Sequence, residues 1–179
     1  MKKKSSKAIR GKTAARRLLV PVDFSDSSLR ALRHAVGLAA ESRGSLTIVH
    51  VVPADYGLLG IGRKEFRDLD KSLQRQAANR LSALASANVP RNVPANLEVR
   101  LGRPAEEIVA ATTESKCDLI VMSTHGVTGL DRYLIGSVAE RVARLAPCPV
   151  ILMRPGKPTR SRKQIRPSIL RFRHKAKPG

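Results

Sequence analysis

The chain has 179 residues, with 34 Lys and Arg against 14 Asp and Glu and a formal net charge of +20. Residues 1–17 contain eight basic side chains and residues 154–179 contain ten, with no acid in either segment, so the part between them is nearly neutral. Aromatic residues make up 3% of the chain and Trp is absent, which argues against a base-stacking surface for single-stranded nucleic acid.

The charged ends set the expected domain boundaries. We expect one domain over residues 17–154, flanked by basic, disordered tails at 1–16 and 155–179. Such tails favour non-specific contact with polyanions such as nucleic acid, or they are simply solvated.

The sequence shows neither a secretion signal nor a membrane span. No apolar segment follows the N-terminal lysines before Arg17, and no apolar run approaches the roughly 18 residues that a transmembrane helix needs. Cys117 and Cys148 lack metal-ligand spacing, as expected of structural thiols in a reducing compartment. We therefore expect a cytoplasmic protein that does not associate with membranes.

Strand and helix patterns alternate after the basic N-terminal segment. Leu18–Val22 predicts a buried parallel strand, and Pro21 is tolerable near its carboxyl end, where the chain leaves the sheet. Ser25 can cap the next helix, and Gly44 can end that helix in a left-handed conformation. Ser45–Val52 is rich in β-branched residues and predicts the second strand.

The same alternation continues to the end of the domain. A helical stripe of apolar residues (Leu69, Leu73, Ala77, Leu81, Leu84) is followed by an alternating segment, Leu97–Leu101, that predicts a strand near the sheet edge. The remaining predicted elements are a helix opened by Pro104, a strand over Leu119–Met122, a helix from Gly136 to about Ala146, and a strand over Val150–Met153. Five strands alternating with four helices predict a doubly wound parallel α/β sheet, in which ligands bind beyond the carboxyl ends of the strands.

Asp23 directly follows the first predicted strand. Its carboxylate could accept hydrogen bonds from ribose hydroxyls or an adenine amine, or help to hold a metal ion. Asp is also a strong helix-capping residue, so a purely structural role in the strand-to-helix turn fits the local sequence equally well.

A candidate phosphate site combines Gly126, Gly129, Gly136 and Ser137. Glycines allow backbone N–H groups to approach an anion, and Ser137 could add a hydroxyl and cap the last helix. An ordinary glycine-rich turn would have the same composition, and neither the P-loop nor the G-x-G-x-x-G fingerprint is present. Of the four histidines only His125 would lie near a ligand there, whereas the others, including His50 in an apolar strand, fit structural or solvent-exposed roles.

Four segments together resemble the universal stress protein family: VPVDFSDSS (residues 20–28), IVHVV (48–52), GRPAEEIV (102–109) and DLIVMSTHGVTGLDRYLIGSVAERVARLAPCPVILMR (118–154). The resemblance implies a Rossmann-like five-stranded sheet of order 3-2-1-4-5 with four helices, and a homodimer formed through the last strand, Val150–Met153. It also implies a role in the stress response.

Members of that family that bind ATP carry G-x-x-G, nine residues, then G-[ST]. Here Ser123-Thr-His-Gly126, nine residues and Gly136-Ser137 match, with Ser123 in place of the first glycine. The resemblance implies a site for ATP, with or without Mg²⁺, built from Pro21, Asp23, Val51, Met122, Ser123, His125, Gly126, Val127, Gly136, Ser137 and Val138.

The leading hypothesis is thus a cytoplasmic, dimeric stress-response protein that binds ATP as a regulatory ligand. We identify no catalytic residue, so we expect at most a slow ATPase. One alternative is a dimeric interaction module that binds no nucleotide, which the serine at the first motif glycine favours. The other is association with polyanions or nucleic acid through the basic tails.

Overall fold

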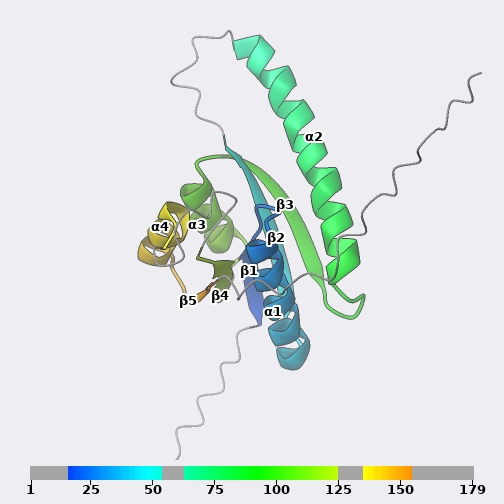
Figure 1. Cartoon of the computed structure of the whole chain (residues 1–179), viewed down its shortest axis with the longest axis vertical. Helices are drawn as coiled ribbons and strands as arrows, with labels where there is room; N and C mark the ends of the chain where they lie inside the picture. The colour runs from blue at the N-terminus through cyan, green and yellow to red at the C-terminus, as the bar shows by residue number, and fades with distance from the viewer. Residues whose placement is uncertain (1–15, 54–62, 125–134, 155–179) are drawn as a thin grey trace, which may run out of the picture.

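A computed structural model describes residues 16–53, 63–124 and 135–154, and within them five strands alternate with four helices (Figure 1). In chain order the elements are β1 (Arg17–Pro21), α1 (Asp26–Ser42), β2 (Ser45–Pro53), α2 (Arg63–Asn88), β3 (Ala95–Gly102), α3 (Pro104–Glu114), β4 (Leu119–Ser123), α4 (Ser137–Leu145) and β5 (Val150–Met153).

The strands form one parallel sheet in the order β3-β2-β1-β4-β5, so the predicted fold class and strand order are confirmed. The segment Leu97–Leu101 lies in the edge strand β3, as its alternating pattern predicted. The chain order reverses between β1 and β4, which is the topological switch point where this architecture binds ligands.

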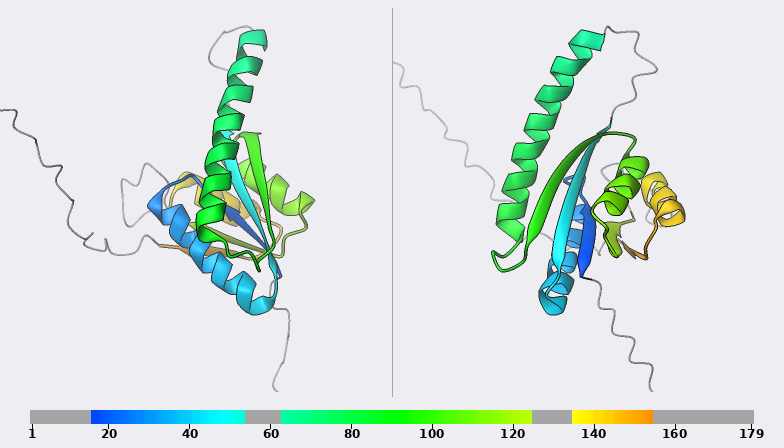
Figure 2. Two further views of the ribbon diagram at one scale, coloured as in Figure 1. Left: turned by 90° about the vertical axis from the view of Figure 1, so that its right-hand side faces the viewer. Right: turned by 180° about the vertical axis from the view of Figure 1, so that it is seen from behind.

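Two helices cover each face of the sheet, as the two views of Figure 2 show. On one face, α1 and α2 pack on alternate strand residues, including Leu18, Val20 and Ile48. On the other, α3 and α4 pack on the residues between them, including Leu19, Val49 and Ile120. Both sides of the central strands are therefore buried, which is why these strands are continuous apolar runs in the sequence.

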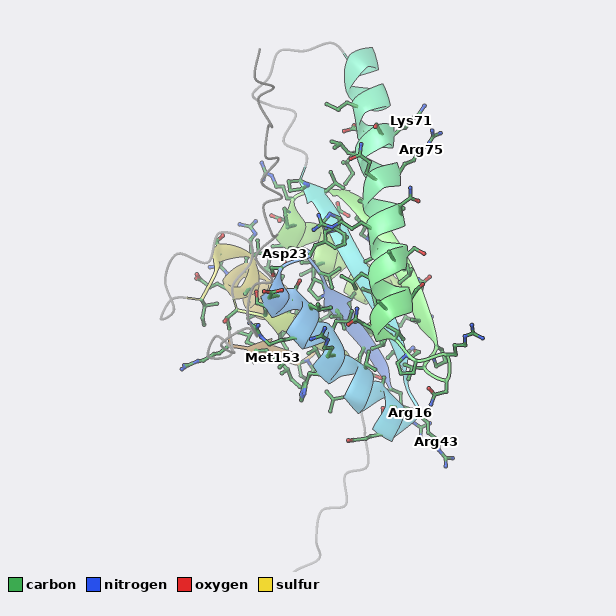
Figure 3. All side chains as sticks on the ribbon, turned by 45° about the vertical axis from the view of Figure 1, so that its right-hand side comes forward. Arg16, Asp23, Arg43, Lys71, Arg75 and Met153 are labelled. Atoms are coloured by element: carbon green, nitrogen blue, oxygen red, sulfur yellow. The ribbon has the colours of Figure 1, made fainter. Side chains whose placement is uncertain are left out.

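The apolar stripe of α2 is only partly covered. Ala77 and Leu81 are buried, whereas Leu69 is 55% exposed and Leu73 38% exposed. Leu69 and Leu73 are exposed because the first part of α2 extends past the end of the sheet (Figure 1). Lys71 and Arg75 project from this part of the helix (Figure 3).

The turn between α1 and β2 corrects one prediction. Ser25 caps α1 as expected, its side chain accepting a hydrogen bond from the Ser28 N–H (3.2 Å). The left-handed residue at the other end, however, is Arg43 (φ 52°) and not Gly44. Gly44 is required for a different reason: a Cβ there would overlap the backbone carbonyl oxygen of Arg16.

The amino edge of the sheet is closed by hydrogen bonds within the chain. The Ser45 N–H donates to the Arg16 carbonyl oxygen (2.6 Å), and the Asp118 N–H donates to that of Arg17 (2.9 Å). The Asp118 carboxylate in turn accepts from the N–H groups of Arg16 (3.2 Å) and Arg17 (3.1 Å). These bonds fix where β1, β2 and β4 begin.

Among the described helices, none is both long and apolar enough to cross a membrane. Cys117 is buried and Cys148 half-buried, and both are free thiols. Burial raises the pKa of both thiols, which favours their protonated form at neutral pH.

Candidate functional site

A cavity of about 480 Å³ opens at the carboxyl edge of the sheet. It exists because β1 pairs with β2 only as far as Pro21 and Val49, while β2 continues to Pro53. Its walls come from the ends of β1, β2 and β4 and the starts of α1, α3 and α4: Pro21, Val22, Asp23, Ser28, Val49, His50, Val51, Pro53, Pro104, Ile108, Met122, Ser123, Thr124, Gly136, Ser137, Val138 and Ala139.

Most of the residues predicted for the site meet in this cavity. The structure brings together Pro21, Asp23, Val51, Met122, Ser123, Gly136, Ser137 and Val138, which come from segments more than 100 residues apart in the chain. His125, Gly126 and Val127 lie outside the described residues, as does Gly129. Their part in the site stays a prediction, as does the ligand-binding role of the others.

Asp23 is held in place by its neighbours. One carboxylate oxygen, Oδ1, accepts from the Ser25 N–H (3.0 Å) and the Ser25 hydroxyl (2.6 Å), and the Asp23 N–H donates to the Ser28 hydroxyl (3.4 Å). Burial raises the pKa of Asp23, but these hydrogen bonds outweigh it and lower the pKa below its ordinary value. The cap of α1 is Ser25, so Asp23 is a fixed anion in the cavity wall and not the helix cap itself.

The backbone of Val51 faces the cavity. The Val22 N–H donates to the Val49 carbonyl oxygen (2.8 Å), so the backbone of Val49 points toward β1. Alternation along the strand turns the backbone of Val51 to the same side, where β1 has already ended. An N–H donor and a C=O acceptor are therefore presented side by side at this point.

The N-terminus of α4 forms the opposite wall. Gly136 is the N-cap (φ −63°, ψ 147°), and α4 has no side-chain cap bond, so the prediction that Ser137 caps the helix is wrong. The Gly136 N–H donates to the Thr124 carbonyl oxygen (2.7 Å), which ties this helix start to the end of β4. The first turn of a helix presents N–H groups and a partial positive charge, which suit an anionic ligand.

His50 lines the cavity, which the sequence did not suggest. Its Nδ1 lies 2.8 Å from the Val22 carbonyl oxygen, an acceptor, so Nδ1 carries the proton in this bond. The ring also packs on Phe24 (centroids 4.4 Å apart), and the Arg80 guanidinium carbon lies 4.1 Å from the centre of the Phe24 ring. Because Phe24 has a left-handed backbone (φ 64°), this stack holds the loop that carries Asp23 in a conformation unusual for a non-glycine residue.

Thr124 is a second residue that the sequence did not single out. Its N–H (2.9 Å) and hydroxyl (3.3 Å) both donate to the Met153 carbonyl oxygen at the end of β5. Together with the bond from Gly136, this makes Thr124 the link between β4, β5 and α4. The position next to His125 was the only signal available in the sequence.

The chemistry of the wall suits a flat, mainly apolar group with a polar edge and an anionic end. Among the described lining residues Asp23 is the only carboxylate, and none is Lys or Arg. The described part of the chain also holds no cluster of three or more side chains suited to bind a metal ion.

Comparison with known proteins gives a match over nearly the whole described domain. A family model described as "Universal stress protein family" matches residues 14–154. Universal stress protein MJ0531 of Methanocaldococcus jannaschii is 36% identical over 80% of this chain and 85% of its own length. Universal stress protein YxiE of Bacillus subtilis is 33% identical over 77% of this chain and 98% of its own.

Solved structures resemble the fold over the same region. Universal stress protein UspA from Lactobacillus plantarum has a TM-score of 0.62 at 28% identity and covers 78% of this chain and 98% of its own. A universal stress protein solved in complex with cAMP has a TM-score of 0.53 at 26% identity and covers 79% of this chain and 98% of its own.

Proposed function

Because the chain belongs to the universal stress protein family, we propose that it binds an adenine nucleotide, foremost ATP, as a regulatory ligand in the carboxyl-edge cavity. The observation that carries the proposal is the convergence, in one cavity, of the Val51 backbone, the Asp23 carboxylate and the start of α4. The relative in complex with cAMP supports an adenine nucleotide as the class of ligand.

The residues present fit such a ligand. A volume of about 480 Å³ lies in the range of small-molecule sites, roughly 300–1,000 Å³. The Val51 N–H and C=O match the acceptor and amine of an adenine edge, and the fixed Asp23 carboxylate accepts from sugar hydroxyls. The N–H groups of Ser137 and Val138 in the first turn of α4 would receive the phosphates, with Mg²⁺ as an optional counter-ion.

The edge strand β5 suggests how the protein assembles. The edge strand β5 is half-buried at all four residues, and pairing with β5 of a second copy would cover its open side. We therefore propose a cytoplasmic homodimer that acts in the stress response through nucleotide occupancy, with ATP turnover absent or slow.

A binding experiment tests the proposal. The purified full-length protein is analysed for nucleotide that co-purifies, and ATP affinity is measured by calorimetry with and without Mg²⁺. We expect binding that Gly136→Val abolishes, because Gly136 lines the cavity, and that Gly37→Val preserves, because Gly37 lies in open space on α1. No binding of any adenine nucleotide by the unmodified protein would refute the proposal and leave a dimeric interaction module as the function of the fold.

The distribution of charge favours a second activity, association with polyanions through the basic ends. All but two of the net twenty positive charges lie in residues 1–17 and 154–179. Binding to duplex DNA should then weaken steeply with salt and disappear when both ends are neutralised. Salt-insensitive binding would contradict this activity.

A further inference from the structure

Phe24 connects the loop after β1 to two other parts of the fold. It follows Asp23 in the turn that leads into α1. Its ring packs on His50 of β2 with centroids 4.4 Å apart, and the guanidinium carbon of Arg80 in α2 lies 4.1 Å from its centre. His50 lines the cavity, and its Nδ1 lies 2.8 Å from the Val22 carbonyl oxygen. These three side chains (His50, Phe24 and Arg80), here called the Phe24 stack, therefore link the cavity wall to α2.

The backbone of Phe24 needs the support of the stack. Its φ of 64° lies in the left-handed region, which is unfavourable for a residue with a side chain and persists only where surrounding contacts maintain it. The hydrogen bonds that fix Asp23 span this residue, because Asp23 Oδ1 accepts from the N–H (3.0 Å) and the hydroxyl (2.6 Å) of Ser25. A change in the backbone of Phe24 would therefore separate Asp23 from Ser25 and release the carboxylate.

Arg80 provides the contact that reaches the stack from α2. The helix is anchored here by the buried side chains of Ala77 and Leu81, so the base of the Arg80 side chain is held in place. Among the described residues, none forms an ion pair with Arg80. A guanidinium above an aromatic ring is attracted to the electron density of the ring face. The contact thus holds Phe24 in place, and no ion pair within the described part of the chain competes for the guanidinium.

The position of Asp23 matters only to a ligand that Asp23 touches. In the proposed site this carboxylate accepts from the ribose hydroxyls, and a fixed acceptor loses less conformational freedom on binding than a mobile one. The stack should therefore strengthen the binding of a nucleotide that has these hydroxyls. It should not change the binding of an analogue that lacks both of them.

We propose that Arg80 is a positioning residue of the nucleotide site. Through Phe24 it holds the Asp23 carboxylate toward the sugar, and so makes the site select nucleotides with ribose hydroxyls over dideoxynucleotides. The inference rests on the proposed function, because it presupposes that the cavity holds the nucleoside with its sugar beside Asp23. It assigns to the middle of α2 a part in ligand selectivity, although Arg80 does not line the cavity.

One variant of Arg80 and a matched control test the proposal in the full-length protein. Arg80→Met removes the cation and keeps a long side chain. Arg75→Met makes the same change of charge at an exposed position of α2 that projects past the sheet. Dissociation constants for ATP and for 2′,3′-dideoxy-ATP are measured by calorimetry. The two nucleotides carry the same charge, so a general electrostatic effect of losing one arginine acts on both equally.

We expect the unmodified protein to bind ATP more tightly than the dideoxy analogue. Arg80→Met should weaken ATP binding about fivefold, because a cation–π contact at an exposed site contributes about that factor. The same variant should bind the dideoxy analogue as the unmodified protein does. Arg75→Met should match the unmodified protein for both nucleotides.

The results that would overturn the inference differ from those that would overturn the proposed function. An equal loss for both nucleotides in Arg80→Met would show that Arg80 acts on the site as a whole, and an unchanged ATP affinity would show that it only covers the core. Equal affinity of the unmodified protein for ATP and the dideoxy analogue would also overturn the inference and leave the nucleotide site standing. No binding of either nucleotide by the unmodified protein would overturn both.

Discussion

The two edges of the sheet differ in what their polar groups do: those at the amino edge bond to one another, and those at the carboxyl edge surround a cavity. At the amino edge, the polar groups of Arg16, Arg17, Ser45 and Asp118 satisfy one another at distances of 2.6–3.2 Å, and Gly44 permits the close approach. At the carboxyl edge the strands end at different heights, and side chains, a strand backbone and a helix start surround a cavity. The comparison teaches that one edge of this domain fixes the fold and that the other is available for binding.

Gly44→Val should have the largest effect and should act on stability alone. The added Cβ overlaps the Arg16 carbonyl oxygen, so the amino edge must open, at a cost of about 3 kcal/mol in the free energy of unfolding. Urea denaturation measures the loss, and Gly37→Val is the matched control at an uncrowded site. ATP affinity, measured well below the unfolding temperature, should be unchanged. A large fall in affinity would contradict the claim that the amino edge serves stability and not binding.

His50→Leu should lower both stability and nucleotide affinity. Leucine leaves the Val22 carbonyl oxygen without the Nδ1 donor, which costs about 2 kcal/mol, and loosens the loop that carries Asp23. Thermal unfolding and calorimetry report the two effects. His34→Leu, on the exposed side of α1, should change neither. A His50 variant that binds ATP normally would show that the stack serves the fold only.

Asp118→Ala should cost about 1 kcal/mol of stability, because the N–H groups of Arg16 and Arg17 turn to water instead of the carboxylate. Asp118→Asn should cost less, since its amide oxygen still accepts. Chemical denaturation at several salt concentrations measures both, and unchanged ATP binding is expected. Equal losses for the two variants would argue against the hydrogen-bond explanation.

Asp23→Asn should have the smallest effect on stability, under about 1 kcal/mol at neutral pH. The folded pKa of Asp23 lies below its value in the unfolded chain, which is about 3.9, so the ionised carboxylate stabilises the fold above that pH. The difference in the free energy of unfolding between the unmodified protein and Asp23→Asn should therefore shrink as the pH falls below about 4 and through the folded pKa of Asp23. Melting curves of both proteins from pH 3 to pH 7 test this. A difference in melting temperature that is as large at pH 3 as at pH 7 would contradict the explanation.

The sequence predicted the layers of the fold better than its turns. Runs such as Leu18–Val22 and Ser45–Val52 are buried on both faces, and such burial leaves a clear pattern. Gly44 was misinterpreted because a glycine needed for close approach cannot be distinguished in sequence from one needed for a positive φ. The strand order came from the family resemblance, since periodicity alone does not fix which strands are neighbours.

The site was predicted where the residues lie in recognisable motifs and missed where geometry decides. Asp23, Gly136 and Ser137 belong to such motifs and line the cavity. His50 was assigned a structural role because it lies in an apolar strand, and only the early end of β1 exposes it to the cavity. Thr124 acts through hydrogen bonds to Met153 and Gly136 that tertiary structure alone brings together.

The length of one strand sets the size of the cavity. β1 and β2 start in register, at Arg17 and Ser45, but β1 has five residues and β2 nine, so β2 overhangs by roughly 13 Å. Pro21 is the last residue of β1, and one further bond, from the Val22 N–H to the Val49 carbonyl oxygen, joins the chain to β2 before it turns away. A change in the length of β1 relative to β2 would therefore deepen or fill this cavity, and so change the ligand that fits, without altering either hydrophobic core.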